Sequence, residues 1–368
     1  MQVLSLGKPL PGKSTVNRLE PTPAGAGEGS RYKKIVMHSD CVDAFLEDIF
    51  LQAHPTPPPR IVIDLDATFA PLHGHQLGRF FHGYYDCYCY LPLYVFCGEH
   101  LLAAKLRPAG VDGAAGAVEV IRRIVRQIRA AWPAVEIVLR GDSGFCREPL
   151  MRCCESEGVQ FLFGLARNNR LCRIIGAELH QAKLQCQATA APARIFKEFE
   201  YRTKKSWSRS RRVIAKAEHL PKGANPRFVV TSIPAEQFEA QKLYEQEYCA
   251  RGEMENRIKE QQLYLFADRV SAATMRANQV RLYEAGVAYQ LIHALRRLGL
   301  KDTPLEQAQA PTLRQKLLKI GTQVRVSVRR VWLSWSQAYP YQTLFRQVYE
   351  NLTGRAPSFR PAPLPLRC

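Results

Sequence analysis

Two spacings of apolar residues alternate along the chain and predict its secondary structure. Short runs of β-branched and aromatic residues predict strands, whereas apolar residues three and four positions apart predict helices with one buried face. The predicted strands cover residues 61–68, 84–96, 100–106, 135–142 and 159–165, and the predicted helices cover residues 32–53, 114–131 and 148–158. Strands first and alternation afterwards predict an α/β fold, in which a mixed sheet is flanked by helices.

The amino-acid composition changes in the second half of the chain. Residues 170–240 are rich in basic and aromatic positions and predict a small β-rich insertion, which is followed by a helix over residues 241–266. Further helices are predicted over residues 272–298 and 312–320, and a strand with one basic face over residues 324–329. We therefore expect an N-terminal arm with a short helix (1–59), the first part of a core (60–169), the insertion (170–240), core helices (241–300), a basic C-terminal segment (301–353) and a disordered tail (354–368).

Composition restricts the possible partners. The chain has 368 residues, of which 46% are hydrophobic, a formal net charge of +19 and a pI near 9.6. A globular protein with this excess of positive charge is expected to bind a polyanion, most simply nucleic acid. The 11 cysteines do not have the spacing of a zinc site, which predicts reduced thiols in a cytosolic protein. Neither a signal peptide nor a membrane-spanning segment is expected.

Acidic residues close two of the predicted strands. The apolar run that begins at Ile61 ends in Asp64-Leu65-Asp66-Ala67-Thr68, and the run that begins at Val135 ends in Asp142. Carboxylates at the end of a buried strand usually meet a cation, a metal or a strong hydrogen-bond donor. The alternative is that the aspartates only cap the following turn. Two such strand ends favour a site, because ligands bind at the carboxyl ends of strands in α/β sheets.

The insertion supplies a basic surface with aromatic residues among its charges. Between Arg194 and Arg227 there are 11 basic and 3 acidic residues. Such a surface can hold phosphates with Lys and Arg and stack bases on aromatic rings. The alternative is a solvated sheet face over an ordinary aromatic core. The candidate DNA-binding residues here are Arg202, Lys204, Lys205, Trp207, Arg209, Arg211 and Arg212.

The helix predicted over residues 241–266 places four functional side-chain types on one face. Arg251, Glu255 and Lys259 are four residues apart, and Tyr248 precedes Glu255 by seven. On a surface helix, this pattern is by itself typical of a row of weak salt bridges.

Together, the three acidic positions resemble a known enzyme family. Asp at one strand end, Asp at another and Glu on a later helix resemble the plan of DDE transposases with an RNase H-like catalytic domain. The motif Tyr-x-x-Arg-x-x-x-Glu, here Tyr248, Arg251 and Glu255, is similar to the signature of the insertion-sequence superfamily that moves by cut and paste. Asp66-Ala67-Thr68 and Asp142-Ser143-Gly144 match the steps that carry the first and second acid. The resemblance extends over about residues 10–352.

The resemblance implies a two-metal nuclease that acts on double-stranded DNA. Asp66, Asp142 and Glu255 are expected to bind two Mg²⁺ ions, with Mn²⁺ as a possible substitute and Asp64 as the reserve ligand for Asp66. Tyr248, Arg251 and Lys259 are expected to contact phosphates beside the scissile bond. Water would attack at the element end, and the released 3′-hydroxyl would attack the opposite strand or the target. Cutting two inverted-repeat ends in concert implies a homodimer.

The chain departs from the family pattern at three places. The family lysine usually lies seven residues after the Glu, where this chain has Gln262, so that Lys259 or Arg257 would have to substitute for it. Relatives often carry a further acid after the Asp-x-Thr step, where this chain has Phe69-Ala70. They also generally have an additional N-terminal DNA-binding region. Two other functions therefore stay open: an inactive or truncated remnant that only binds DNA, and an RNase H-like nuclease that is not mobile.

Overall fold

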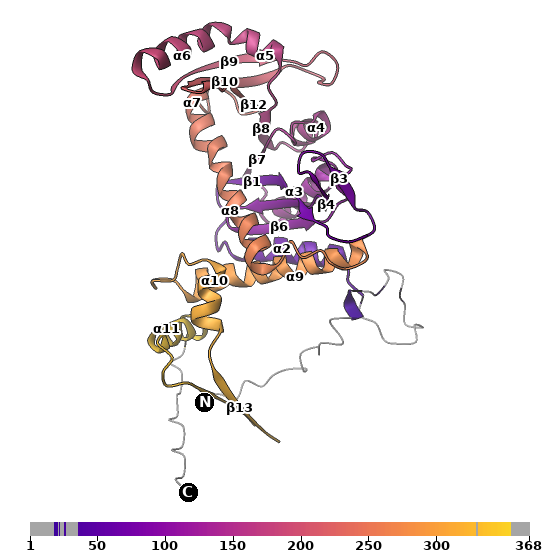
Figure 1. The fold of residues 1–368 in the computed structure, drawn as a ribbon, viewed down its shortest axis with the longest axis vertical. Coiled ribbons are helices and arrows are strands. Elements are labelled where there is room, and N and C mark those ends of the chain that lie inside the picture. The colour runs from indigo at the N-terminus through magenta and orange to yellow at the C-terminus, as the bar shows by residue number, and fades with distance from the viewer. Residues whose placement is uncertain (1–17, 21, 23–25, 27–35, 329, 355–368) are drawn as a thin grey trace. The chain divides into compact units, whose positions relative to one another are not determined.

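The computed structural model describes residues 18–20, 22, 26, 36–328 and 330–354 (Figure 1). The chain divides into two compact units. The larger unit comprises His38–Lys259 and Asp268–Tyr283, and the smaller one contains the described parts of Met1–Met37, Glu260–Ala267 and Glu284–Cys368. The arm predicted over residues 1–31 falls almost wholly outside the described residues, as does the tail after Gly354.

Every residue of the larger unit is described, and nine of its strands form one mixed sheet. The neighbours run in the order β11-β10-β12-β8-β7-β1-β5-β6, and β9 pairs with β10. The central strands β1, β7 and β8 are parallel, whereas β5 is antiparallel to both β1 and β6, and a turn at Gly98-Glu99 joins it to β6. The strands span Arg60–Ala67 (β1), Leu93–Cys97 (β5), His100–Lys105 (β6), Glu136–Gly141 (β7), Gln160–Leu165 (β8), Ala193–Tyr201 (β9), Arg211–Leu220 (β10), Gly223–Ala224 (β11) and Arg227–Thr231 (β12).

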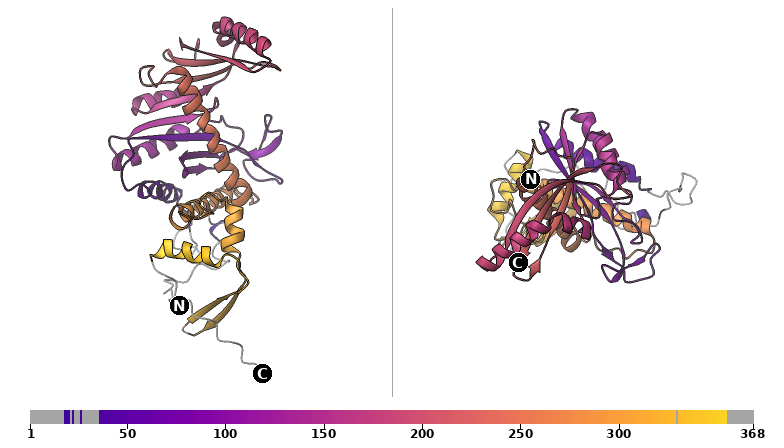
Figure 2. Two further views of the ribbon diagram at one scale, coloured as in Figure 1. Left: turned by 90° about the vertical axis from the view of Figure 1, so that its left-hand side faces the viewer. Right: turned by 90° about the horizontal axis from the view of Figure 1, so that it is seen from above.

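Helices cover both faces of this sheet, because its central strands are apolar on both sides. One face packs against helices α2 (Ser39–Gln52), α3 (Ala117–Ala131) and α4 (Glu148–Ser156) in the main hydrophobic core. The other face packs against a helical run that begins with α7 (Ala240–Lys242). The run continues through a π-helical turn (Leu243–Tyr248), a 3₁₀ turn (Cys249–Arg251) and α8 (Gly252–Lys259), and it passes along the sheet in Figures 1 and 2. A mixed α/β sheet flanked by helices is thus confirmed, and it is compatible with an RNase H-like fold.

One predicted strand is divided in two in the structure. The single strand expected over residues 84–96 is interrupted at Leu91-Pro92 and forms two strands in different sheets. Its first part, β4 (Cys87–Tyr90), joins β2 (Ala70–Pro71) and β3 (Phe80–His82) in a small separate sheet, and its second part is β5. Proline has no backbone N–H to donate, which explains the break at this point.

The region predicted as a β-rich insertion contains two helices and four strands. It begins with two helices, α5 (Asn169–Ile174) and α6 (Gly176–Thr189). Its strands then extend the central sheet, because β12 pairs with β8 from Phe228 opposite Leu165 to Thr231 opposite Leu162. The hydrophobic core therefore continues from the first half of the chain into this region.

The smaller unit is mainly helical. Its described core packs Ile292, Leu300, Leu313, Leu317 and Val348 together. Its elements, with α9 shared between the units, are η3 (Glu260–Tyr264), α9 (Met275–Ala294), η4 (Leu295–Gly299), α10 (Ala310–Leu313), η5 (Arg314–Leu318), β13 (Thr322–Ser327), β14 (Arg330–Trp335) and α11 (Gln342–Thr353). None of the helices in the described part of the chain has the length and apolar character needed to span a membrane.

Candidate active site

Alternation along β1 directs three side chains toward the helical run. Ile61, Ile63 and Leu65 lie in the main core, so that Val62, Asp64 and Asp66 point to the opposite face. Val62 packs there against the cluster that contains residues of the π-helical turn. The strand thus carries its two aspartates on the sheet face that also meets the signature helix.

Asp64 belongs to a buried ion pair. Arg140 on β7 lies directly opposite Asp64, and its Nε and Nη2 donate to the two carboxylate oxygens at 2.6 and 2.8 Å. The guanidinium also donates to the backbone carbonyl of Glu247 on the helical run. Both side chains of the pair are nearly inaccessible, at 8% for Arg140 and 2% for Asp64. Asp64 therefore joins two strands to the helix, and its oxygens are already occupied.

Asp66 and Asp142 come together because they end neighbouring parallel strands. Leu65 pairs with Gly141, the last residue of β7, so that the next residues of the two strands are Asp66 and Asp142. Asp66 Oδ1 accepts a hydrogen bond from the N–H of Ala67 at 2.9 Å. Asp142 Oδ1 accepts one from the N–H of Gly144 at 2.8 Å. These turn contacts orient both carboxylates at the same edge of the sheet.

Glu255 and Arg251 approach this edge from the helical run. Arg251 Nη2 donates to Glu255 Oε1 at 3.0 Å, as expected for residues four apart on a helix. Burial raises the pKa of Asp66 to about 6; Arg251 opposes this shift, whereas the charges of Asp142 and Glu255 reinforce it. Burial alone would lower the pKa of Arg251, but Asp66, Glu255 and Asp142 raise it. The three acids and Arg251 thus form one electrostatic cluster.

Tyr248 reaches the same cluster above a glycine. A Cβ atom at Gly164 on β8 would lie 2.6 Å from the Tyr248 hydroxyl and 2.9 Å from the backbone N of Ser143. No real side chain fits at such distances, so that glycine is needed where β8 passes under this hydroxyl. Burial raises the pKa of Tyr248, and Arg251 opposes this shift. The phenol therefore stays protonated and can donate a hydrogen bond at neutral pH.

The donor set suits hard divalent cations, which prefer carboxylate oxygens. The contacts of Asp66 and Asp142 with the backbone and of Glu255 with Arg251 each use one carboxylate oxygen and leave the other for a further ligand. Within the described residues, however, no group of three or more His, Cys, Asp or Glu side chains already has the spacing of a metal site. The charges of Asp142 and Glu255 act on Asp66, and like charges in such proximity repel one another unless a cation is bound. The residues present therefore fit divalent ions whose binding draws the carboxylates together.

The predicted DNA-binding residues are in three different environments. Arg202, Lys204, Lys205 and Arg209 are exposed in the loop between β9 and β10, and Lys259 is exposed at the end of α8. Trp207, in the same loop, is only 5% exposed and packs against Tyr201 with 5.7 Å between ring centroids. Tyr248 and Arg251 lie half-buried beside the acids.

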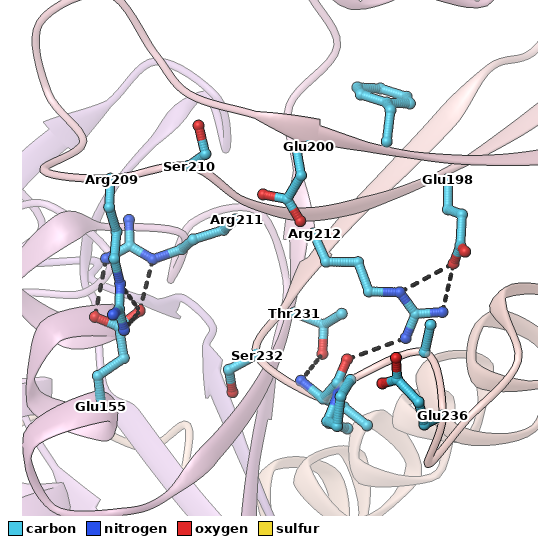
Figure 3. A pocket seen from close by; sticks show the side chains of 14 residues that line it. Glu155, Glu198, Glu200, Arg209, Ser210, Arg211, Arg212, Thr231, Ser232 and Glu236 are labelled. Atoms are coloured by element: carbon cyan, nitrogen blue, oxygen red, sulfur yellow. Dashed lines mark hydrogen bonds and ion pairs between the residues drawn. The ribbon is translucent and has the colours of Figure 1, made fainter.

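Two of the predicted arginines are neutralised within the protein. Arg211 is buried between Glu148 and Glu155, each 2.8 Å away. Arg212 donates to Glu198 and to two backbone carbonyls. Figure 3 shows Arg211 directed toward Glu155 and Arg212 toward Glu198, together with Arg209, which contacts Glu155 at 2.7 Å. Among the described residues of this loop, Arg202, Lys204 and Lys205 are therefore the cations that form no ion pair.

Sequence patterns did not single out three further residues of this region. Arg140 was hidden because its partner Asp64 is 76 positions away. Gly164 had a weak signal, since it interrupts the apolar strand Phe161-Leu162-Phe163-Gly164-Leu165. Tyr85 lies close enough to Asp66 and Asp142 for their charges to act on it, and burial, reinforced by these charges, raises its pKa to about 12.

Comparison with known proteins agrees with this arrangement. A family model described as "Transposase DDE domain group 1" matches residues 1–356. No curated protein gives a significant match. The match covers the whole sheet, the two strand-end aspartates and the helix that carries Glu255. The chain therefore belongs to the group 1 family of DDE-domain transposases.

Proposed function

We propose that this protein cleaves DNA at the ends of an insertion sequence and joins the released 3′ end to a target, as a member of the cut-and-paste superfamily with the Tyr-x-x-Arg-x-x-x-Glu signature. The observation that carries the proposal is the cluster of Asp66, Asp142 and Glu255 at one edge of the sheet. Carboxylates close enough for their charges to act on one another repel unless they hold cations. Phosphodiester cleavage uses this kind of oxygen donor set.

Asp66, Asp142 and Glu255 would hold two Mg²⁺ ions, or Mn²⁺ in their place. When bound, the cations would stabilise negative charge on the attacking and leaving oxygens of the phosphate. The backbone contacts of Asp66 and Asp142 keep their carboxylates oriented, which reduces the reorganisation needed for binding. Glu255 is exposed and bonded to Arg251 through Oε1, so that its other carboxylate oxygen is the one that would bind the cation.

Tyr248, Arg251 and Lys259 would hold the DNA strand beside the scissile phosphate. The protonated Tyr248 hydroxyl, which lies next to the Asp142-Ser143 backbone, can donate to a phosphate oxygen. Arg251 carries a permanent positive charge at the carboxylate cluster and attracts the same phosphate. Lys259 replaces the family lysine, because Arg257 is bonded to Glu99 at 2.7 Å and to Glu253 at 3.2 Å.

Duplex DNA would extend from the site over the loop between β9 and β10. Ser208 in this loop bonds to Glu148, the first residue of α4, which follows Asp142 closely in the chain. The exposed cations Arg202, Lys204 and Lys205 therefore lie on the sheet edge toward which β7 delivers Asp142. The net charge of +19 supports a polyanionic partner. We also propose that the protein acts as a homodimer, since two element ends have to be cut together. We place its activity in the bacterial cytoplasm.

The test is cleavage of a labelled duplex that carries the terminal inverted repeat, with Mg²⁺ or Mn²⁺. Wild-type protein is expected to nick it, and Asp66→Asn, Asp142→Asn and Glu255→Gln each to abolish nicking. Glu253→Gln is the matched control, because Glu253 is exposed on the same helix but pairs with Arg257 instead of Arg251. Binding without nicking in wild type would indicate an inactive remnant. Cleavage of RNA–DNA hybrids or junctions, but not of the repeat, would indicate a nuclease that is not mobile.

A further inference from the structure

The β3–β4 hairpin beside Asp66 displays an unusual number of exposed aromatic rings. Phe81, Tyr84 and Tyr88 are 45%, 85% and 46% exposed. Phe81 lies directly opposite Tyr88 across the two strands, with 5.5 Å between ring centroids. The guanidinium of Arg79 lies 4.7 Å from the Tyr88 ring centroid. We call residues 79–90 the aromatic hairpin; β3 and β4 are labelled in Figure 1.

The inner side of the hairpin is fixed next to the carboxylates. Tyr85 stacks on Phe69 with 4.4 Å between ring centroids, and its hydroxyl donates to the carbonyl of Ala67 at 3.4 Å. Ala67 is the residue after Asp66, and the charges of Asp66 and Asp142 both act on Tyr85. Phe69, which stands where relatives often carry an acid, thus packs the hairpin against the end of β1.

Tyr84 extends this packing outward into solvent. Its ring contacts the Tyr85 ring edge to face, with 5.0 Å between centroids and 84° between planes. Asp86 completes the turn with a φ of 51°, in the left-handed region that few non-glycine residues adopt. The Tyr85 ring therefore lies between the carboxylate cluster and the Tyr84 ring, which is 85% exposed.

We propose that the aromatic hairpin binds an unpaired base of the DNA strand whose phosphate lies at Asp66 and Asp142, with Tyr84 as its stacking platform. The inference rests on the proposed function. Exposed aromatic rings beside a guanidinium bind unstacked bases without regard to sequence, and each stacked base contributes substantially to affinity. Unpairing the terminal bases of a duplex costs free energy, and stacking of a base on Tyr84 would offset part of that cost.

The experiment compares two labelled duplexes in Ca²⁺, by fluorescence anisotropy. One ends in a short unpaired tail with bases, and the other in an abasic tail of equal length, so that only the bases differ. Wild type is expected to bind the first about fivefold to a hundredfold more tightly, the range for one stacked base. Tyr84→Ala is expected to remove most of this ratio, and Tyr84→Trp to keep it.

Two controls decide between stacking and other roles. Phe45→Ala removes another exposed ring, 48% exposed, from α2 on the sheet face away from the helical run, and it should leave the ratio unchanged. Tyr84→Leu keeps apolar bulk without a ring and should lose the ratio. A full ratio in Tyr84→Leu, or equal binding of both tails by wild type, would overturn the inference. Wild type that cleaves element ends yet binds both tails equally refutes only this inference, whereas a base preference without cleavage refutes only the proposed function.

Discussion

Arg140 on β7 lies directly opposite Asp64 on β1 and donates to both of its carboxylate oxygens, at 2.6 and 2.8 Å. The pair is buried beneath the helical run, where water cannot replace either partner. Asp64 and Asp66 point to the same face of β1. The Asp64–Arg140 ion pair therefore also holds β1 in place close to the carboxylate cluster. Asp64 is thus expected to contribute to stability, and Asp66 to catalysis.

We expect Asp64→Ala to lower the free energy of unfolding by about 3–5 kcal/mol, because it leaves the Arg140 guanidinium buried without its carboxylate. Urea denaturation followed by circular dichroism measures the loss. The double variant Asp64→Leu with Arg140→Met should recover most of it, since an apolar pair replaces the ion pair at similar volume. A single variant as stable as wild type would show that the pair does not hold the sheet.

Asp66 makes the metal-free protein sensitive to pH. Its pKa is raised from 3.8 to about 6 in the folded state, so that folding takes up a proton and the stability contributed by this group falls as pH rises between these values. Asp66→Asn is therefore expected to match wild type near pH 4 and to exceed it by about 1–3 kcal/mol above pH 6, in EDTA. Thermal unfolding across this range measures the difference.

Mg²⁺ provides the control for this prediction. Cation binding favours the ionised carboxylates, so that Mg²⁺ should raise the melting temperature of wild type more than that of Asp66→Asn. At neutral pH, the difference in melting temperature between wild type and Asp66→Asn should then narrow or reverse. An unchanged gap in Mg²⁺ would argue against Asp66 as a metal ligand.

Local sequence patterns predicted the elements of the central sheet because apolar residues repeat at one spacing in strands and at another in helices. Asp142 follows a run of aliphatic residues, and the parallel pairing of β1 with β7 then brings it beside Asp66. Proximity of these strand ends follows from the general geometry of α/β sheets. Their catalytic role, however, stays a prediction that the cleavage assay has to test.

Long-range pairings limited the sequence analysis elsewhere. Trp207 and Arg211 stand in a stretch with the composition of a nucleic-acid surface, yet both are buried. The partners of Arg211 are carboxylates more than 50 positions earlier, on α4. Likewise, the pairing of β12 with β8, through which the strands of residues 170–240 extend the central sheet, joins segments separated by two helices and three strands. Neither relation leaves a local pattern, because each depends on segments that are brought together only by folding.

Gly164 provides a test of the position of Tyr248. A methyl group there would lie 2.6 Å from the Tyr248 hydroxyl, so that Gly164→Ala has to displace the phenol or the Ser143 backbone. We expect cleavage to fall by roughly a hundredfold, since small displacements near a reacting phosphate have effects of this size. Single-turnover cleavage measures the change, with circular dichroism to show that the fold is retained.

Gly176→Ala is the matched control for this substitution, because a methyl group on Gly176 in α6 would meet nothing within 4 Å. It should cleave like wild type. Wild-type cleavage by Gly164→Ala as well would mean that the position of Tyr248 above β8 does not matter for the reaction.

The loop between β9 and β10 carries exposed cations that we propose to bind DNA, whereas the first residue of β10, Arg211, is a buried cation that stabilises the fold. Lys204 and Lys205 are exposed, whereas the Arg211 side chain is 3% exposed between Glu148 and Glu155. Each of Lys204→Ala and Lys205→Ala is expected to weaken duplex binding and to reduce the slope of log K against log salt by about 1. Arg211→Ala should leave that slope unchanged but lower stability by about 2–5 kcal/mol, because it leaves the partly buried Glu148 without its cation and Glu155 with Arg209 alone. Salt titrations of DNA binding and urea denaturation of the same variants measure both quantities, and a reduced salt slope in Arg211→Ala would mean that this arginine contacts DNA after all.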